Sequence, residues 1–170
     1  GGGAERYITH FSKYLSNKNI KHVLILDRDE ITYHYGDCAE VLILRNHLKG
    51  LRLFLPNRLI DIFALIWIKK KMKISHLISG TDKSIINSFF VTECIKISIC
   101  QNNLSQKYSP SKMKAYEKIN LSLLRKGFNN SDYKFSVSDG VQKSMIEFNI
   151  KNEIFSTRNC VDRKHFTCKI

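Results

Sequence analysis

The chain has 170 residues and carries 28 Lys and Arg against 15 Asp and Glu, which gives a net charge of +13. A hydrophobic fraction of 43% excludes disorder along the whole chain, and a content of two prolines and eight glycines excludes a collagen-like or linker-like sequence. So large a positive charge on a short chain predicts a polyanionic partner, nucleic acid first and an anionic membrane surface second.

The first 105 residues alternate helical patterns with short apolar runs. Helices are expected at residues 4–17, 57–71 and 83–90. Apolar runs bounded by polar residues predict buried strands at 22–26, 40–44, 51–55 and 74–79, although the second run also fits a helix. The segment 91–100 fits neither period clearly. This alternation predicts a small α/β domain with a mainly parallel sheet.

The run from Leu59 to Ile68 is the segment most easily mistaken for a membrane span. It has only ten residues, it contains Asp61, and three lysines follow it. A membrane span needs about 20 apolar residues. We therefore interpret the run as a buried core helix with a basic last turn and expect no membrane partner; an interfacial amphipathic helix is the alternative.

The five cysteines form no Cys-x-x-Cys pair, and no secretory signal is visible. This predicts reduced thiols and a cytoplasmic location, with a Cys160–Cys168 bridge in an exported protein as the alternative. Cys38 stands at a possible helix start and is a candidate nucleophile, but no histidine has a diagnostic spacing to it. Neither a zinc-ligand spacing nor a phosphate-binding glycine loop is present, so we expect no metal, no cofactor and no catalytic residue.

The segment 101–111 is polar and contains proline, which predicts a linker between a domain at 1–105 and a domain at 106–170. Beyond it, helices are expected from a cap at Ser109-Pro110 or Ser111 to Gly127, from 130 or 131 to 135, and from 138 or 139 to 155. Three short helices behind a basic surface predict an all-α domain of the helix-turn-helix kind.

A specific spacing supports this interpretation. An acid, leucines and a glycine follow one another in the first of these helices, at Glu117, Leu121, Leu123 and Gly127. Asn130, Val137-Ser138, Asn149, Ile150 and Ile154 continue the pattern. Residues 113–154 thereby resemble the C-terminal DNA-binding domain of LuxR-type (FixJ/GerE-like) transcription regulators.

The stretch 148–154 is similar to an enteric bacterial branch of that family, which includes activators. In that branch the N-terminal half is a degenerate relative of a receiver domain. The resemblance implies a receiver-like domain that serves dimerisation or partner binding, as a homodimer or as a heterodimer with another regulator. If the run 40–44 is the third strand of a receiver domain, it ends in Arg45 and Asn46 and not in a phosphoacceptor Asp, so we expect no control by aspartyl phosphorylation.

The resemblance also implies a DNA interface. A recognition helix at about 139–154 would enter the major groove, with Gln142 placed to bind adenine and Lys143 to reach guanine. The candidate DNA-binding residues are Lys134, Ser138, Gln142, Lys143, Ser144, Glu147, Lys151 and Arg158. The expected function is a sequence-specific regulator of transcription that binds double-stranded DNA and is not an enzyme.

Two alternatives stay open on the sequence alone. A basic Cys/His hydrolase or RNA-cleaving toxin would use the positive charge to capture its substrate. A non-enzymatic interaction module would present a basic face to RNA or to an acidic protein.

Overall fold

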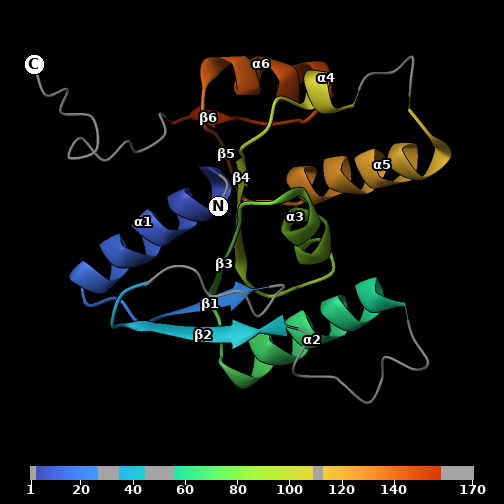
Figure 1. Cartoon of the computed structure of the whole chain (residues 1–170). Helices are drawn as coiled ribbons and strands as arrows, with labels where there is room; N and C mark the ends of the chain where they lie inside the picture. The colour runs from blue at the N-terminus through green and yellow to red at the C-terminus, as the bar shows by residue number, and fades with distance from the viewer. Residues whose placement is uncertain (1–2, 27–34, 45–55, 109–112, 158–170) are drawn as a thin grey trace, which may run out of the picture.

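Figure 1 shows the computed structural model of the chain, which describes residues 3–26, 35–44, 56–108 and 113–157. The helices are α1 (Gly3–Asn17), α2 (Asn57–Lys71), α3 (Asp82–Ser88), α4 (Leu104–Lys107), α5 (Ala115–Asn129) and α6 (Asp139–Glu147). The strands are β1 (His22–Leu26), β2 (Ala39–Ile43), β3 (His76–Ser79), β4 (Ile95–Cys100), β5 (Tyr133–Ser136) and β6 (Phe155–Ser156).

The strands form two sheets, and every pair in them is parallel. β1 pairs with β2, and a separate sheet has the order β3-β4-β5-β6. Each strand of the larger sheet thus lies beside its neighbour in the chain, and helices make the crossovers. α3 and α5 lie on one side of this sheet and α1 on the other, while α4 and α6 contact each other at one end (Figure 1).

Most elements expected in the first 105 residues are confirmed. The helices expected at 4–17, 57–71 and 83–90 are α1, α2 and α3, and the strands expected at 22–26 and 74–79 are β1 and β3. The two ambiguous segments contain β2 and β4. The run 51–55 lies outside the described residues.

The prediction of an all-α C-terminal domain is wrong, because this part of the chain contains β5 and β6. The middle helix expected at about 130–135 is the strand β5, which pairs with β4 so that Lys134 lies beside Ser98. The last helix ends at Glu147 instead of continuing to residue 155, and β6 follows it. Asn149 and Asn152 have positive φ angles of 56° and 69°, which a continuous helix does not allow.

The prediction of a separate receiver-like domain in the N-terminal half is also wrong, because the C-terminal part of the chain contributes strands to the same sheet. The four-stranded sheet takes β3 and β4 from one half of the chain and β5 and β6 from the other. Residue 105, at the expected domain boundary, lies inside α4. The fold is a mixed α/β arrangement in which the C-terminal third completes the sheet.

The larger hydrophobic core lies between this sheet and helices α3, α5 and α6. Leu124, Phe128 and Met145 are completely buried in it. Gly127 does not end the helix as expected, because α5 continues to Asn129. A Cβ atom at Gly127 would lie 2.6 Å from the carbonyl oxygen of Ile85, so the glycine permits α5 to pack closely against α3.

Replacing Gly127 by alanine is therefore expected to lower the free energy of unfolding by about 1 kcal/mol. The clash with Ile85 costs about 1–3 kcal/mol, which exceeds the gain in helix propensity of about 1 kcal/mol. Gly140 is the matched control, because it is exposed in α6 and a Cβ there would meet only the Ser138 hydroxyl, at 4.0 Å.

Gly140→Ala should stabilise the chain by about 0.4–1 kcal/mol. Urea denaturation followed by circular dichroism measures both variants. The close packing of α5 on α3 is refuted if the two substitutions shift stability in the same direction.

Candidate ligand site at the carboxyl edge of the four-stranded sheet

The structure distributes the expected DNA-binding residues over several roles, and three of them point into the fold. The side-chain nitrogen of Gln142 donates to the carbonyl oxygen of Ile154 at 2.6 Å. Ser144 is 2% exposed and accepts a hydrogen bond from the backbone of Leu104 at 3.2 Å. Lys134 is 1% exposed, and burial lowers its pKa.

The other candidate DNA-binding residues are helix caps, hydrogen-bond partners within the fold, or exposed side chains. Ser138 caps α6 by accepting from the Val141 amide at 3.3 Å. Glu147 accepts from the hydroxyl of Ser105 at 2.7 Å, and Lys143 and Lys151 are exposed. Arg158 lies outside the described residues. DNA binding through these residues stays a prediction, but the geometry of Gln142 and Ser144 gives it no support.

A different region gathers polar side chains from three successive crossovers. Because β3, β4, β5 and β6 are parallel, their carboxyl ends meet at one edge of the sheet. Ligands of open α/β sheets bind outside this edge. The residues directly beyond the strands are Gly80-Thr81, Gln101-Asn102-Asn103, Val137-Ser138 and Thr157.

Gly80 permits the first two of these turns to approach each other. It is buried, and a Cβ there would lie 3.1 Å from Nε2 of Gln101 and 3.3 Å from Cδ1 of Ile8 on α1. The buried Nε2 of Gln101 has no hydrogen-bond partner among the residues that the structure describes. An amide donor in this state gains free energy from any acceptor that reaches it, whether water or ligand.

At the start of α3, residues of the helix itself already form hydrogen bonds with the free backbone amides. The Thr81 hydroxyl accepts from the Ser84 amide at 3.2 Å, and the Ser84 hydroxyl accepts from the Thr81 amide at 3.0 Å, which forms a capping box. Asp82 in the first turn lies 2.6 Å from Nζ of Lys107 and accepts from the Tyr108 hydroxyl at 3.0 Å. Burial and the nearby Asp82 carboxylate raise the pKa of Tyr108, so its phenol stays a proton donor.

The start of α6, like that of α3, has a hydroxyl side chain as its cap and an aspartate in its first turn. Ser138 is its cap, and Asp139 in the first turn accepts from the Ser156 hydroxyl at 2.6 Å. Both helix starts at this edge therefore carry their own carboxylate. These carboxylates compete with a phosphate for the partial positive charge of the helix ends.

An open hollow of about 330 Å³ lies at the carboxyl end of β4, and it is lined by Asn102, Asn103, Gln106 and Lys107. Asn103 begins α4, where its side-chain oxygen accepts from the Gln106 amide at 3.2 Å. The lining thus combines amides that donate and accept with one cation that Asp82 already pairs.

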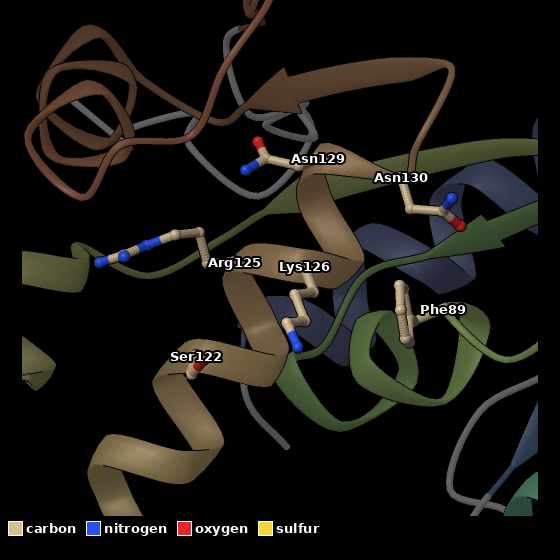
Figure 2. A pocket seen from close by; sticks show the side chains of 6 residues that line it. All are labelled: Phe89, Ser122, Arg125, Lys126, Asn129 and Asn130. Atoms are coloured by element: carbon tan, nitrogen blue, oxygen red, sulfur yellow. The ribbon is translucent and has the colours of Figure 1, made fainter.

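A second hollow of about 510 Å³ lies where α5 leads into β5, at the opposite edge of the sheet. It is lined by Phe89, Ser122, Arg125, Lys126, Asn129 and Asn130. Figure 2 shows that Arg125 and Lys126 extend in different directions from α5, so their charges do not converge on one ligand. The carboxyl edge is therefore the better candidate site.

The described part of the chain gives little support for Cys38 as a nucleophile or for a metal site. Cys38 packs against the end of α1, where its thiol donates to the carbonyl oxygen of Ser16 at 3.8 Å. The amide of His22 donates to the carbonyl oxygen of Cys38 at 3.4 Å, a backbone bond in which neither the imidazole nor the thiol takes part. No group of three or more His, Cys, Asp or Glu in the described ranges could hold a metal ion. The Cys160–Cys168 pair lies outside those ranges.

Sequence reasoning missed this site because it treated residues 101–111 as a linker. The available signal was the amide-rich Gln101-Asn102-Asn103 directly after an apolar segment, together with Gly80-Thr81 after the preceding one. No model of a protein family matches the chain, and neither does any curated protein.

Proposed function

We propose that the chain is a ligand-binding α/β domain that holds a hydroxyl-rich small molecule, of the sugar or nucleoside class, at the carboxyl edge of its four-stranded sheet. The observation that carries the proposal is the gathering of amides, hydroxyls and two aspartates from separate crossovers at this edge.

The chemistry of the edge selects for a neutral polar ligand. A ligand hydroxyl both donates and accepts, which matches the amides of Asn102 and Gln106 in the lining of the hollow. Asp82 and Asp139 accept hydrogen bonds but repel a phosphate, and the caps of both helix starts are already occupied. These features support a polyhydroxyl ligand over a purely ionic one.

Binding can be tested with the full chain by following amide chemical shifts during titration with a panel of monosaccharides and nucleosides. Gln106→Met, at an exposed position that lines the hollow, keeps the length of the side chain and removes its amide; it is expected to weaken binding about fivefold, since one hydrogen bond contributes about 1 kcal/mol. Ser122→Ala, in the second hollow, is the control and should leave the affinity unchanged.

The proposal fails if no ligand of the panel shifts resonances at residues 80–81 and 101–103, or if Ser122→Ala weakens binding as strongly as Gln106→Met. Double-stranded DNA is added in a parallel titration. Specific binding to one duplex over a scrambled duplex would favour the transcription-regulator hypothesis.

We also propose that the protein works in a reducing compartment. Cys38, Cys94 and Cys100 are free thiols, which suits a reducing environment such as the cytoplasm. Among the described helices, none combines the length and the hydropathy that crossing a bilayer requires.

A further inference from the structure

The outer face of α2 exposes large apolar side chains to solvent. Its inner face is the core helix that the sequence predicts, with Ile60, Ala64 and Ile68 buried. Its outer face carries Leu59, Phe63, Trp67 and Lys71, four residues apart, and these side chains lie above one another on one stripe. We call these four residues the α2 stripe.

The apolar part of the α2 stripe is well exposed. Leu59 is 42% exposed, Phe63 53% and Trp67 46%. Exposed apolar side chains are ordinary when scattered, but three in one row on a single helix form a contiguous surface. The row extends over about 18 Å including Lys71, from a rise of about 1.5 Å per residue.

Positive charge gathers at the C-terminal end of the same stripe. Lys70, Lys71 and Lys73 are exposed, and Nζ of Lys71 lies 4.7 Å from the centre of the Trp67 ring. Lys69 is instead directed to Glu93, at 3.4 Å. The stripe thus has an apolar and aromatic body that ends in Lys71, and the exposed Lys70 and Lys73 are its neighbours in the sequence.

We propose that the α2 stripe binds the surface of an anionic lipid membrane. Leu59, Phe63 and Trp67 would enter the boundary between headgroups and acyl chains, as the apolar face of an interfacial helix does. The lysines would contact the anionic headgroups, and the net charge of +13 would attract the whole chain to the leaflet.

Charge argues for lipid over a second copy of the chain as the occupant. Two copies that each carry +13 repel one another, and stacking two stripes would bring their lysine clusters close together or place them against Leu59. An anionic leaflet satisfies the apolar and the cationic parts of the stripe at once. The binding is peripheral and independent of the proposed ligand site, which lies at the edge of the other sheet.

The chain contains a built-in reporter for this contact. Trp67 is its sole tryptophan, and it lies in the stripe. Transfer into the membrane interface should shift its fluorescence to shorter wavelength when the full chain meets vesicles of phosphatidylcholine and phosphatidylserine in equal parts. Co-sedimentation gives the partition coefficient, which should fall as salt is added because screening weakens the lysine contacts.

Two variants separate the apolar from the ionic contribution. Phe63→Ser should lower the partition coefficient about tenfold. Lys70→Gln with Lys71→Gln should lower it about fivefold for each lysine on anionic vesicles, and much less on pure phosphatidylcholine. Tyr116→Ser, which removes an aromatic ring that is 58% exposed on α5, and Lys143→Gln are the matched controls and should bind like the parent chain.

Far-ultraviolet circular dichroism verifies that each variant is folded. The proposal is overturned if the parent chain does not sediment with anionic vesicles, or if the controls lose as much binding as the stripe variants. It is equally overturned if the parent chain forms a dimer without lipid and Phe63→Ser abolishes it, because the stripe would then serve self-association.

Discussion

Exchanging Lys83 for methionine is expected to lower the free energy of unfolding by about 3 kcal/mol at neutral pH. The carboxylate of Asp61 is 3% exposed inside α2, and Nζ of Lys83 on α3 lies 2.6 Å from its Oδ2. Removing the lysine leaves a buried carboxylate without its cation. The Lys83 side chain is 37% exposed, so water partly replaces it, and we expect the lower end of the range for broken buried pairs.

A second ion pair of equal length is the control. Nζ of Lys107 also lies 2.6 Å from a carboxylate, that of Asp82, but this lysine is 46% exposed and the carboxylate less deeply buried. Lys107→Met should cost at most about 1 kcal/mol. Urea denaturation followed by Trp67 fluorescence gives both values.

The double variant Asp61→Leu with Lys83→Met tests the cause. It removes both charges and should recover most of the lost stability, because an apolar pair of similar volume replaces a buried ion pair at little cost. A double variant that is as unstable as Lys83→Met alone would mean that Lys83 stabilises the fold through packing and not through Asp61.

Asp61 also illustrates what the sequence could predict and what it could not. The apolar period around it identified α2 as a core helix, and the structure confirms this for the inner face. Its cation is supplied by a helix that follows only after β3, and no local pattern reports such a distant pairing. The exposed rings of Phe63 and Trp67 were likewise not predictable, because apolar residues around a whole helix are ordinarily buried.

The C-terminal third was misjudged because its strand does not look apolar. β5 buries Lys134 and Ser136 and exposes Tyr133, which reverses the usual alternation of apolar inside and polar outside. The first three of its four residues, preceded by Asn, Ser and Asp, were predicted as the end of a short helix that begins at 130 or 131. The strand becomes recognisable only when β4 lies beside it.

The expected DNA-binding residues were likewise only partly predictable from local sequence patterns. Ser138 was correctly expected to begin a helix, and it caps α6. The helix that it begins packs against α4 through Ser144, so side chains expected in a DNA groove are engaged inside the fold. Resemblance carried by single spaced residues could not distinguish a recognition helix from a crossover helix, since both need a cap and one apolar face.

Replacing Lys134 by methionine is expected to raise the free energy of unfolding at neutral pH by about 1–3 kcal/mol. The lysine is 1% exposed, and its Nζ donates to the carbonyl oxygen of Ser131 at 2.9 Å. Burial lowers its pKa, so the folded chain bears the cost of a desolvated ammonium or of its deprotonation. Methionine fills the same space without this cost, although the Ser131 carbonyl loses one donor.

The dependence on pH identifies the cause. A lysine with a lowered pKa binds fewer protons in the folded than in the unfolded chain, so the parent chain gains stability as pH rises from that lowered pKa towards the ordinary value of 10.5. The advantage of Lys134→Met should therefore shrink over this window. Lys96, whose pKa burial also lowers, is present in both proteins and cancels in the difference.

Lys126→Met, at an exposed position of α5, is the control and should change stability by less than about 0.5 kcal/mol at any pH. Equilibrium denaturation at a series of pH values measures all three proteins. A DNA-contacting lysine would behave in the opposite way, since its loss would leave stability unchanged and weaken binding to a duplex. A loss of stability in Lys134→Met would instead show that the bond to Ser131 outweighs the desolvation of the ammonium group.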